Sequence, residues 1–177
     1  MKNNNIITID GPSASGKGSL AKALAKQLNF ILLDSGLLYR AYSYCFDQSQ
    51  NHSVAAELFS NLRIDSIENE MRVFEQKKDI TSILRNENVA KSASKLSSLK
   101  ETRDNLISFQ RDLASNHGLV ADGRDMGTVV FPDAGTKIFL VADAEVRAKR
   151  RFLELQNADQ GVNMRDLIED IRLRDEA

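Results

Sequence analysis

The sequence is poor in the residues that cross-link or interrupt a chain. Among its 177 residues it has one cysteine, Cys45, two prolines, Pro12 and Pro132, and no tryptophan. A single cysteine excludes a disulfide framework within the chain and is typical of a reducing compartment. Few prolines favour long, unbroken helices. We therefore expect a helix-rich cytoplasmic protein in which Cys45 is a small buried side chain.

An excess of charge and long apolar runs are also lacking. The 24 lysine and arginine residues balance 25 aspartate and glutamate residues, which gives a net charge of −1. No overall field therefore attracts nucleic acid or an acidic membrane, and any anion site must be built locally. The first residues, "MKNNNIITID", contain an apolar run far too short for a signal peptide, and no later run reaches membrane length. We expect neither nucleic acid nor membrane as a partner.

The elements that are present alternate between strands and helices. "NIITID" (5–10) and "FILLD" (30–34) are short apolar runs typical of buried strands, and each precedes a stretch with helical spacing, at 17–29 and 37–46. "GLVADG" and "TKIFLVA" indicate two further buried strands. This order predicts an α/β fold, with a parallel sheet covered by helices in one domain.

The middle of the chain, from about residue 51 to 81, has a different pattern. "LRIDSI" and "EMRVFEQ" alternate apolar and polar residues, which predicts a small antiparallel insertion. Residues 88–116 are helical again in pattern. "DAEVRAKRRFLELQ" and "MRDLIEDIRLRDEA", separated by "NADQGVN", predict two amphipathic helices at the end of the chain.

The stretch "TIDGPSASGKGS" has the glycine and lysine spacing of a phosphate-binding loop. Glycines allow successive backbone N–H groups to point at a phosphate, the following helix adds its dipole, and a lysine adds a full charge. The usual hydroxyl after the lysine is replaced by Gly18 and comes one place later, at Ser19, where it can still hold Mg²⁺. The alternative is an ordinary strand–turn–helix connection. The expected nucleotide-binding residues are Gly11, Pro12, Ser13, Ala14, Ser15, Gly16, Lys17, Gly18 and Ser19.

Two further segments should lie at the same edge of the sheet. "LLDSGLLYR" follows the second strand, and "VADGRDMGTVVFPD" follows a later one. Ligands of open α/β folds bind at the carboxyl ends of the strands. Arginines there suit a phosphate, which guanidinium binds through two hydrogen bonds, and an aspartate closing a strand suits the magnesium shell. The alternative for "GRDMG" is a surface Arg–Asp pair in a glycine turn. The expected residues are Asp34, Ser35, Tyr39, Arg40, Asp122, Arg124 and Asp125.

Taken together, "DGPSASGKGS", "LLDSGLLYR", "ADGRDMGTVVFPDA" and "KIFL" closely resemble the bacterial cytidylate kinases, nucleoside monophosphate kinases with a phosphate-binding loop. The resemblance runs from about Ile6 to Arg174 and is weakest between Gln48 and Ile80. It implies a three-layer αβα kinase fold in a single domain, 1–177, with an inserted acceptor-binding region at about 51–98 and a helical lid at about 147–174. It implies ATP- and Mg²⁺-dependent phosphorylation of CMP or dCMP, by a monomer.

The resemblance also implies roles for particular residues. Lys17, Arg124 and Arg150 would be catalytic, and Ser19 and Asp122 would hold the metal. Cytosine presents an amino donor beside two acceptors, so a carboxylate and an arginine can read it, whereas uracil would repel the carboxylate. From the residues alone, Ser94 and Arg103 lie on solvated helix faces. The implied substrate-binding residues are Ser13, Ser35, Tyr39, Arg40, Ser94, Arg103, Arg124, Asp125 and Arg174, with lid arginines Arg147, Arg150 and Arg151.

The sequence departs from the family at its end, "IRLRDEA". The family continues with another aspartate, another arginine, a helix and a strand, so we expect that this sequence represents a truncated protein. Other functions remain open. An adenylate or shikimate kinase would share the phosphate loop but not "GRDMGTVVFPD", and a GTP-dependent switch protein would carry an Asn-Lys-x-Asp motif, which we do not find. The third alternative is a nucleotide-binding module without activity.

Overall fold

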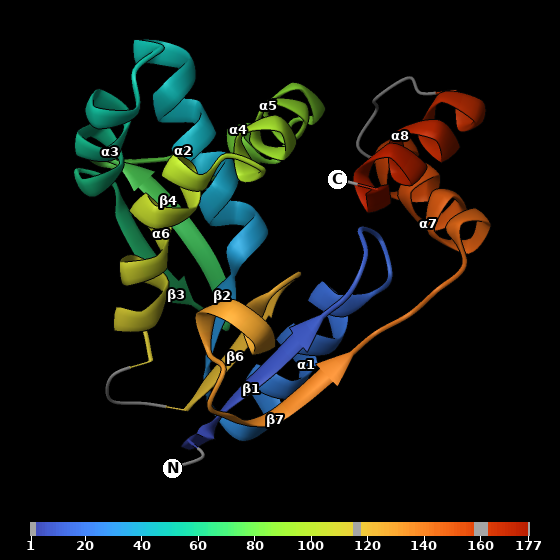
Figure 1. Cartoon of the computed structure of the whole chain (residues 1–177), viewed down its shortest axis with the longest axis horizontal. Helices are drawn as coiled ribbons and strands as arrows, with labels where there is room; N and C mark the ends of the chain where they lie inside the picture. The colour runs from blue at the N-terminus through green and yellow to red at the C-terminus, as the bar shows by residue number, and fades with distance from the viewer. Residues whose placement is uncertain (1–2, 115–117, 158–162, 177) are drawn as a thin grey trace.

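The computed structural model, which describes residues 3–114, 118–157 and 163–176, is built around a four-stranded sheet (Figure 1). Its strands are β1 (Asn3–Asp10), β2 (Ile31–Asp34), β6 (Leu119–Gly123) and β7 (Ala134–Phe139). They lie in the order β2-β6-β1-β7, and each neighbouring pair is parallel. The alternation of strands and helices in the sequence predicted this parallel sheet correctly.

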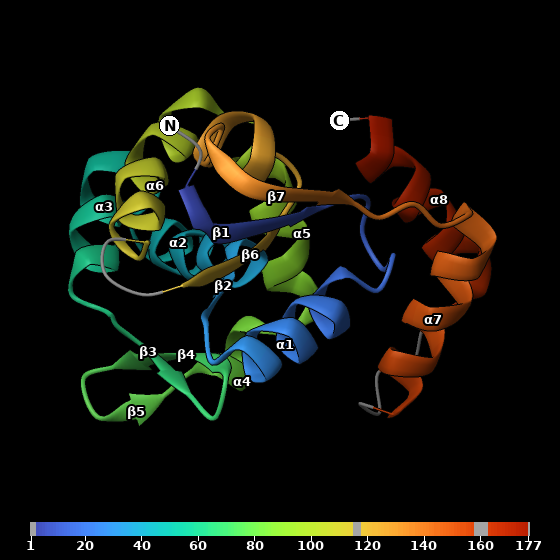
Figure 2. The same cartoon turned by 90° about the horizontal axis from the view of Figure 1, so that it is seen from below.

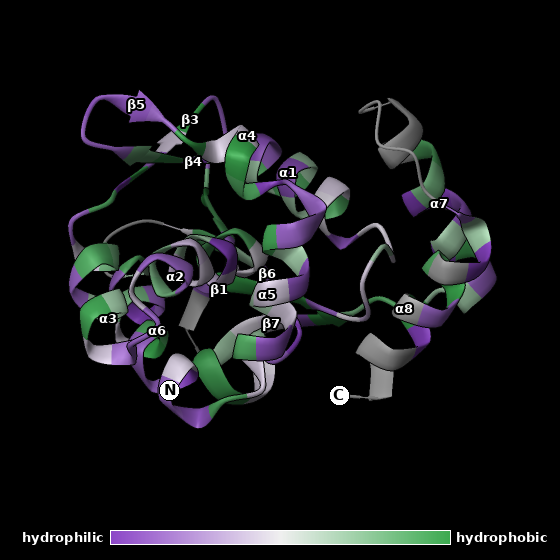
Figure 3. Cartoon of the chain, turned by 90° about the horizontal axis from the view of Figure 1, so that it is seen from above, coloured by the Kyte–Doolittle hydropathy of each residue, from purple (hydrophilic) through white to green (hydrophobic). Residues whose placement is uncertain are grey.

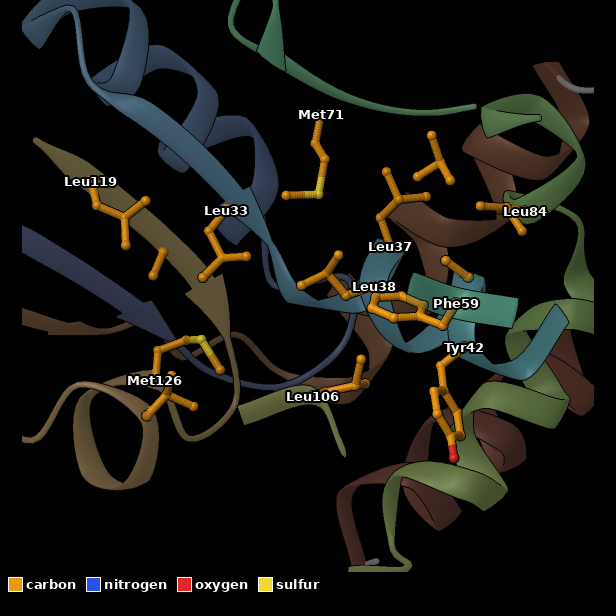
Figure 4. Packing of buried hydrophobic residues seen from close by; sticks show 14 of the residues in the cluster. Leu33, Leu37, Leu38, Tyr42, Phe59, Met71, Leu84, Leu106, Leu119 and Met126 are labelled. Atoms are coloured by element: carbon orange, nitrogen blue, oxygen red, sulfur yellow. The ribbon is translucent and has the colours of Figure 1, made fainter. Parts of the chain in front are cut away.

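Helices cover both faces of the sheet, because consecutive strand residues point to opposite sides. In β2, Leu32 packs with Ala21 and Ala25 of α1 (Lys17–Leu28) on one face. Leu33 lies on the other face, in a core cluster that also includes residues of α2 (Ser35–Ser49), α3 (His52–Ser60) and α6 (Lys100–Asp112) (Figure 4). The three-layer αβα architecture is confirmed. Cys45 is buried on α2, as expected.

The insertion contains the expected antiparallel sheet, formed by β3 (Arg63–Ile67), β4 (Glu70–Glu75) and β5 (Lys78–Asp79). Its hairpin at β5 is hydrophilic (Figure 3), whereas Met71 and Val73 of β4 join the core. Figure 2 shows this sheet to one side of the helices α2, α3 and α6. Short α4 (Thr81–Leu84) and α5 (Glu87–Ser97) follow.

The expectation of antiparallel structure from residue 51 onward was wrong for residues 51–62, which form the cap of α3, the helix itself and the turn after it. The Asn51 side chain accepts hydrogen bonds from the backbone N–H groups of Ser53 and Val54, which caps the helix. Ala55 and Phe59 are four residues apart, lie on the same face of the helix and are both buried. The capping residue and this spacing favour a helix over a strand.

The expectation of a buried strand at 136–142 was also wrong in part. β7 ends at Phe139 and lies at the edge of the sheet, where it pairs with β1 alone among the described strands. Phe139 is therefore 69% exposed, and Val141, beyond the strand, is 73% exposed. Apolar composition alone did not reveal that this strand has a neighbour on one side only.

Two helices, α7 (Ala144–Asn157) and α8 (Met164–Glu176), pack against each other beside the sheet (Figure 1). Their contact is apolar and includes Ala148, Leu167 and Ile171. These are the two amphipathic helices that the sequence predicts, but residues 158–162 of the expected lid lie outside the described residues. None of the described helices is both long enough and apolar enough to cross a membrane.

Candidate active site

The phosphate-binding loop connects β1 to α1. Its backbone takes positive φ values at Gly11, Ala14 and Gly16. A Cβ at Gly11 would lie 2.2 Å from the carbonyl oxygen of Leu140, so only glycine fits there. Gly16 precedes the first turn of α1 and caps it with no side chain, which leaves the N-terminal N–H groups of the helix to a ligand.

The lysine of the loop reaches back across it. Lys17 Nζ donates to the carbonyl oxygen of Pro12 at 2.9 Å and lies 4.0 Å from Asp122 Oδ1. Burial lowers the pKa of Lys17, and the charge of Asp122 acts in the opposite direction. The lysine is therefore held over the loop by the carboxylate at the end of β6.

Three aspartates meet at this edge of the sheet because their strands end at nearly the same level. Asp122 is paired in register with Asp34 of β2, and the next pair joins Asp10 of β1 to Gly123. Burial, helped by the charges of Asp34 and Asp10 and opposed by that of Lys17, raises the pKa of Asp122 to about 7. Such a carboxylate is short of positive charge, and a cation would keep it ionised.

The unusual position of the hydroxyl has a structural explanation. A Cβ at Gly18 would lie 3.3 Å from Asp122 Oδ2, so the side chain of Asp122 lies against the position where the usual serine or threonine would stand. Ser19 and Asp122 border the same cavity, of about 580 Å³, between α1 and the small sheet. No three histidine, cysteine or acidic side chains form a metal cluster within the described ranges. One hydroxyl and one carboxylate suit Mg²⁺, which usually keeps several waters and binds the phosphates of the substrate.

A second cavity, of about 220 Å³, lies beside the loop and gathers residues from distant segments. It is bordered by the loop residues Ser13 and Lys17 and by Asp122. Arg174 lies in α8, and its side chain is outside the described residues. The other seven predicted substrate-binding residues all border this cavity: Ser35, Tyr39, Arg40, Ser94, Arg103, Arg124 and Asp125. We call it the acceptor pocket.

Hydrogen bonds arrange the side chains of the acceptor pocket. Arg103 donates through Nη2 to Asp125 Oδ2 and through Nε to the carbonyl oxygen of Ser97, both at 3.0 Å. Burial raises the pKa of the neighbouring Tyr39, and the charge of Asp125 raises it further. Arg40 donates to the carbonyl oxygen of Leu84 at 3.3 Å. The pocket therefore presents a fixed arginine–aspartate pair and a partly buried arginine.

Arginines of α7 close the other side of the loop. Arg147 and Arg150 donate through Nη1 to the carbonyl oxygens of Ser13 and Ser15, at 3.3 and 2.8 Å. Arg151 donates to Glu87 Oε2 of α5 at 2.6 Å. Helix α7 thus contacts both the phosphate loop and the helix that carries Ser94.

Two contributors to this site were missed by reasoning from the sequence. Ser97 borders the pocket one turn after Ser94. Asp10, noted only as the end of a strand, accepts hydrogen bonds from the backbone N–H groups of Met126 and Gly127, both at 2.8 Å. An aspartate directly before a glycine-rich loop indicates a residue of the site. Its partners could not be read from the sequence, because they lie 116 and 117 residues away in the chain.

A parallel sheet whose first strand runs into a phosphate-binding loop, beside a pocket lined by arginines, defines a nucleotide-binding protein of the phosphate-binding-loop class. The family model "Cytidylate kinase" matches residues 7–177. The chain is 46% identical to "Cytidylate kinase" of Pseudomonas fluorescens, with 97% of the chain and 78% of the relative aligned. It is 44% identical to "Cytidylate kinase" of Mannheimia succiniciproducens, over 99% and 80%, and to "Cytidylate kinase 2" of Haemophilus influenzae, over 96% and 79%. The chain belongs to the cytidylate kinase family, and it is an enzyme, a kinase that acts on small nucleotides.

Proposed function

We propose that this kinase transfers a phosphoryl group from ATP to CMP or dCMP, with Mg²⁺, to give CDP or dCDP. The observation that carries the proposal is that the acceptor pocket contains Lys17 of the phosphate loop together with Arg40, Arg103, Arg124 and Asp125. Donor and acceptor groups can therefore meet in one cavity. The names of the relatives support the same acceptor.

ATP is bound by Gly11–Ser19, through backbone N–H groups and Lys17. The Ser15 hydroxyl is buried in this loop and has no hydrogen-bond partner among the described residues, which suits a loop built around a ligand. Ser19 and Asp122 are the candidates to hold Mg²⁺, and the raised pKa of Asp122 fits a carboxylate that accompanies a cation. When bound, the ion supplies positive charge to the phosphates.

The acceptor nucleotide occupies the other part of the pocket. Arg40 and Arg124, with Tyr39, bind its phosphate, because two guanidinium groups can each offer paired hydrogen bonds. Asp125 accepts from the cytosine amino group while Arg103, fixed by its contacts to Asp125 and Ser97, donates to the base acceptors. Ser35 and Ser94 complete this set. The regions at about 51–98 and 147–174 serve as acceptor-binding insertion and lid.

The reaction needs little proton transfer. The attacking group is a phosphate oxygen, and a phosphate monoester with a second pKa near ~6 is largely ionised at neutral pH. Lys17, Arg124 and Arg150 neutralise the charge that develops during transfer, and the contacts of α7 with the loop and with Glu87 help to exclude water. Positioning and charge neutralisation thus account for catalysis without a general base.

The test is phosphorylation of an acceptor panel with ATP and Mg²⁺: CMP, dCMP, UMP, AMP, GMP and shikimate. We expect CMP and dCMP to be preferred, since Asp125 and Arg103 match cytosine. Turnover of AMP or shikimate in preference to CMP would refute the proposed acceptor. Binding of ATP without turnover of any acceptor would favour a nucleotide-binding module.

A further inference from the structure

The short turn that follows Arg124 and Asp125 is held at both ends by side chains from other elements. This π-helical turn, η1, spans Met126–Val130. At its start, Asp10 Oδ1 accepts from the N–H of Met126 and Oδ2 from the N–H of Gly127, each at 2.8 Å. At its end, Arg111 of α6 donates through Nε to the carbonyl oxygen of Val130 at 2.9 Å and through Nη2 to that of Val129 at 3.0 Å. Both attachments use two hydrogen bonds.

The attachment at Asp10 is buried and close. Asp10 is only 6% exposed, and hydrogen bonds between an ionised carboxylate and backbone N–H groups are stronger than those between neutral groups. A Cβ at Gly127 would lie 2.6 Å from Thr8 Oγ1 and 3.2 Å from Asp10 Oδ2. The turn therefore rests directly on β1, at a distance that only glycine permits without a shift.

The turn leaves its own backbone little freedom. The N–H groups of Val129 and Val130 both donate to the carbonyl oxygen of Asp125, at 2.9 and 3.2 Å, and that of Phe131 donates to Met126 at 2.7 Å. Displacing the start of η1 would therefore displace Asp125, whose side chain is paired with Arg103. Arg124 precedes Asp125 directly and would move with it.

Asp10 also adjoins the donor side, since the next residue is Gly11 of the phosphate loop. One carboxylate thus connects the strand that carries the loop to the turn that carries the acceptor-binding pair. We infer that Asp10 is a positioning residue which, with Arg111 at the opposite end of η1, sets Arg124 and Asp125 at the correct distance from the phosphate loop. The inference rests on the proposed function, because it assigns the acceptor phosphate and base to these two residues.

The test compares Asp10→Asn with Arg111→Gln. Asparagine keeps the shape of Asp10 but turns an N–H₂ group toward one of the two backbone N–H groups, so one hydrogen bond is lost. We expect the KM for CMP to rise about tenfold, the usual effect of losing a charge-assisted hydrogen bond, while the KM for ATP changes less than about twofold. Arg111→Gln acts from α6, at the end of η1 opposite to Asp10, and should shift the KM for CMP in the same direction. Asp104→Asn, on the exposed surface of α6, is the matched control.

Amide hydrogen exchange supplies a readout that does not depend on activity. The amides of Met126 and Gly127 should exchange slowly in the wild type and faster in Asp10→Asn. The inference is overturned by equal rises in the two KM values, which would place the effect in the phosphate loop, or by faster exchange with an unchanged KM for CMP.

If the wild type phosphorylates a different acceptor, the proposed function fails. The role of Asp10 is then decided by comparing the change in KM for that acceptor with the change in KM for ATP. If Asp10→Asn does not fold, Arg111→Gln decides it.

Discussion

The phosphate loop and the acceptor pocket lie side by side but are built in opposite ways. The loop is one continuous segment, Gly11–Ser19, whose chemistry resides mainly in backbone N–H groups and one lysine. The acceptor pocket is a set of side chains brought together from α2, α5, α6 and the end of β6. A loop of this kind can be recognised from a short pattern, whereas the pocket exists only when distant elements pack correctly.

The two regions also differ in charge. The phosphate loop adjoins three aspartates at the sheet edge, and Lys17 is its one charged residue. The acceptor pocket contains Arg40, Arg103 and Arg124. Under the proposed function, an added cation would accompany the aspartates on the donor side, while three arginines supply positive charge on the acceptor side. Substitutions on the two sides should accordingly affect different kinetic constants.

The largest effect should come from Lys17→Met. No backbone group can replace the charge of Lys17, so we expect kcat to fall by about 10²–10³-fold at saturating ATP. Binding of CMP, measured by calorimetry, should change little. Lys22→Met is the control, since Lys22 lies on the same helix and pairs with Glu70 at an exposed site. A similar loss in both variants would show that α1 as a whole, rather than Lys17, is responsible.

A smaller, acceptor-specific effect is expected for Arg124→Lys. Lysine keeps the charge but loses the paired hydrogen bonds of the guanidinium, so the KM for CMP should rise about 10- to 100-fold. The KM for ATP should stay nearly constant in steady-state kinetics. Arg63→Lys, at an exposed arginine of β3, is the matched control. An equal rise for ATP would contradict the separation of donor and acceptor sides.

Asp125→Asn should change selectivity more than rate. The asparagine carboxamide can turn either its oxygen or its N–H₂ group toward the base, so it no longer repels the oxygen that uracil carries in place of the amino group. We expect the ratio of kcat/KM for CMP over UMP to fall about tenfold. Asp133→Asn, at an exposed position after η1, serves as the control. An unchanged ratio would remove Asp125 from base recognition.

The phosphate loop can be predicted from the sequence far better than the acceptor pocket. The loop and the flanking strand and helix follow from local spacing, and the structure has them where they were expected. Ser94 and Arg103 could not be found in this way, because their stretches have the polar pattern of a solvated helix face. They border the pocket only because α5 and α6 pack beside α2. Their positions were implied by the resemblance alone.

Errors in the fold have the same origin. The exposure of β7 depends on how many neighbours the strand has, and the attachment of Asp10 to η1 joins residues 116 and 117 apart in sequence. Neither is a local property. In contrast, the helix at His52–Ser60 has a local signal in its Asn51 cap, although the residues that follow it alternate in the manner of a strand.

The smallest expected effect concerns stability, and it compares the charges of the two regions directly. Asp122 has a pKa of about 7 when folded, against an ordinary value of 3.8. Between these values the folded protein holds a proton that the unfolded chain releases, so the free energy of unfolding should fall as pH rises from about 4 to about 7. Asp122→Asn cannot titrate and should lose this part of the slope. We therefore expect the free energy of unfolding to fall less steeply with pH in Asp122→Asn than in the wild type.

Urea unfolding at pH 5, 6, 7 and 8 would measure the difference, in the absence of nucleotide and divalent cations. Asp104→Asn, an exposed aspartate on α6, should leave the slope of the wild type unchanged. Parallel slopes for the wild type and Asp122→Asn would mean that Asp122 is ionised throughout. Lys17 and the other groups near Asp122 would then supply enough positive charge without an added cation. The two sides would no longer differ in their need for a cation.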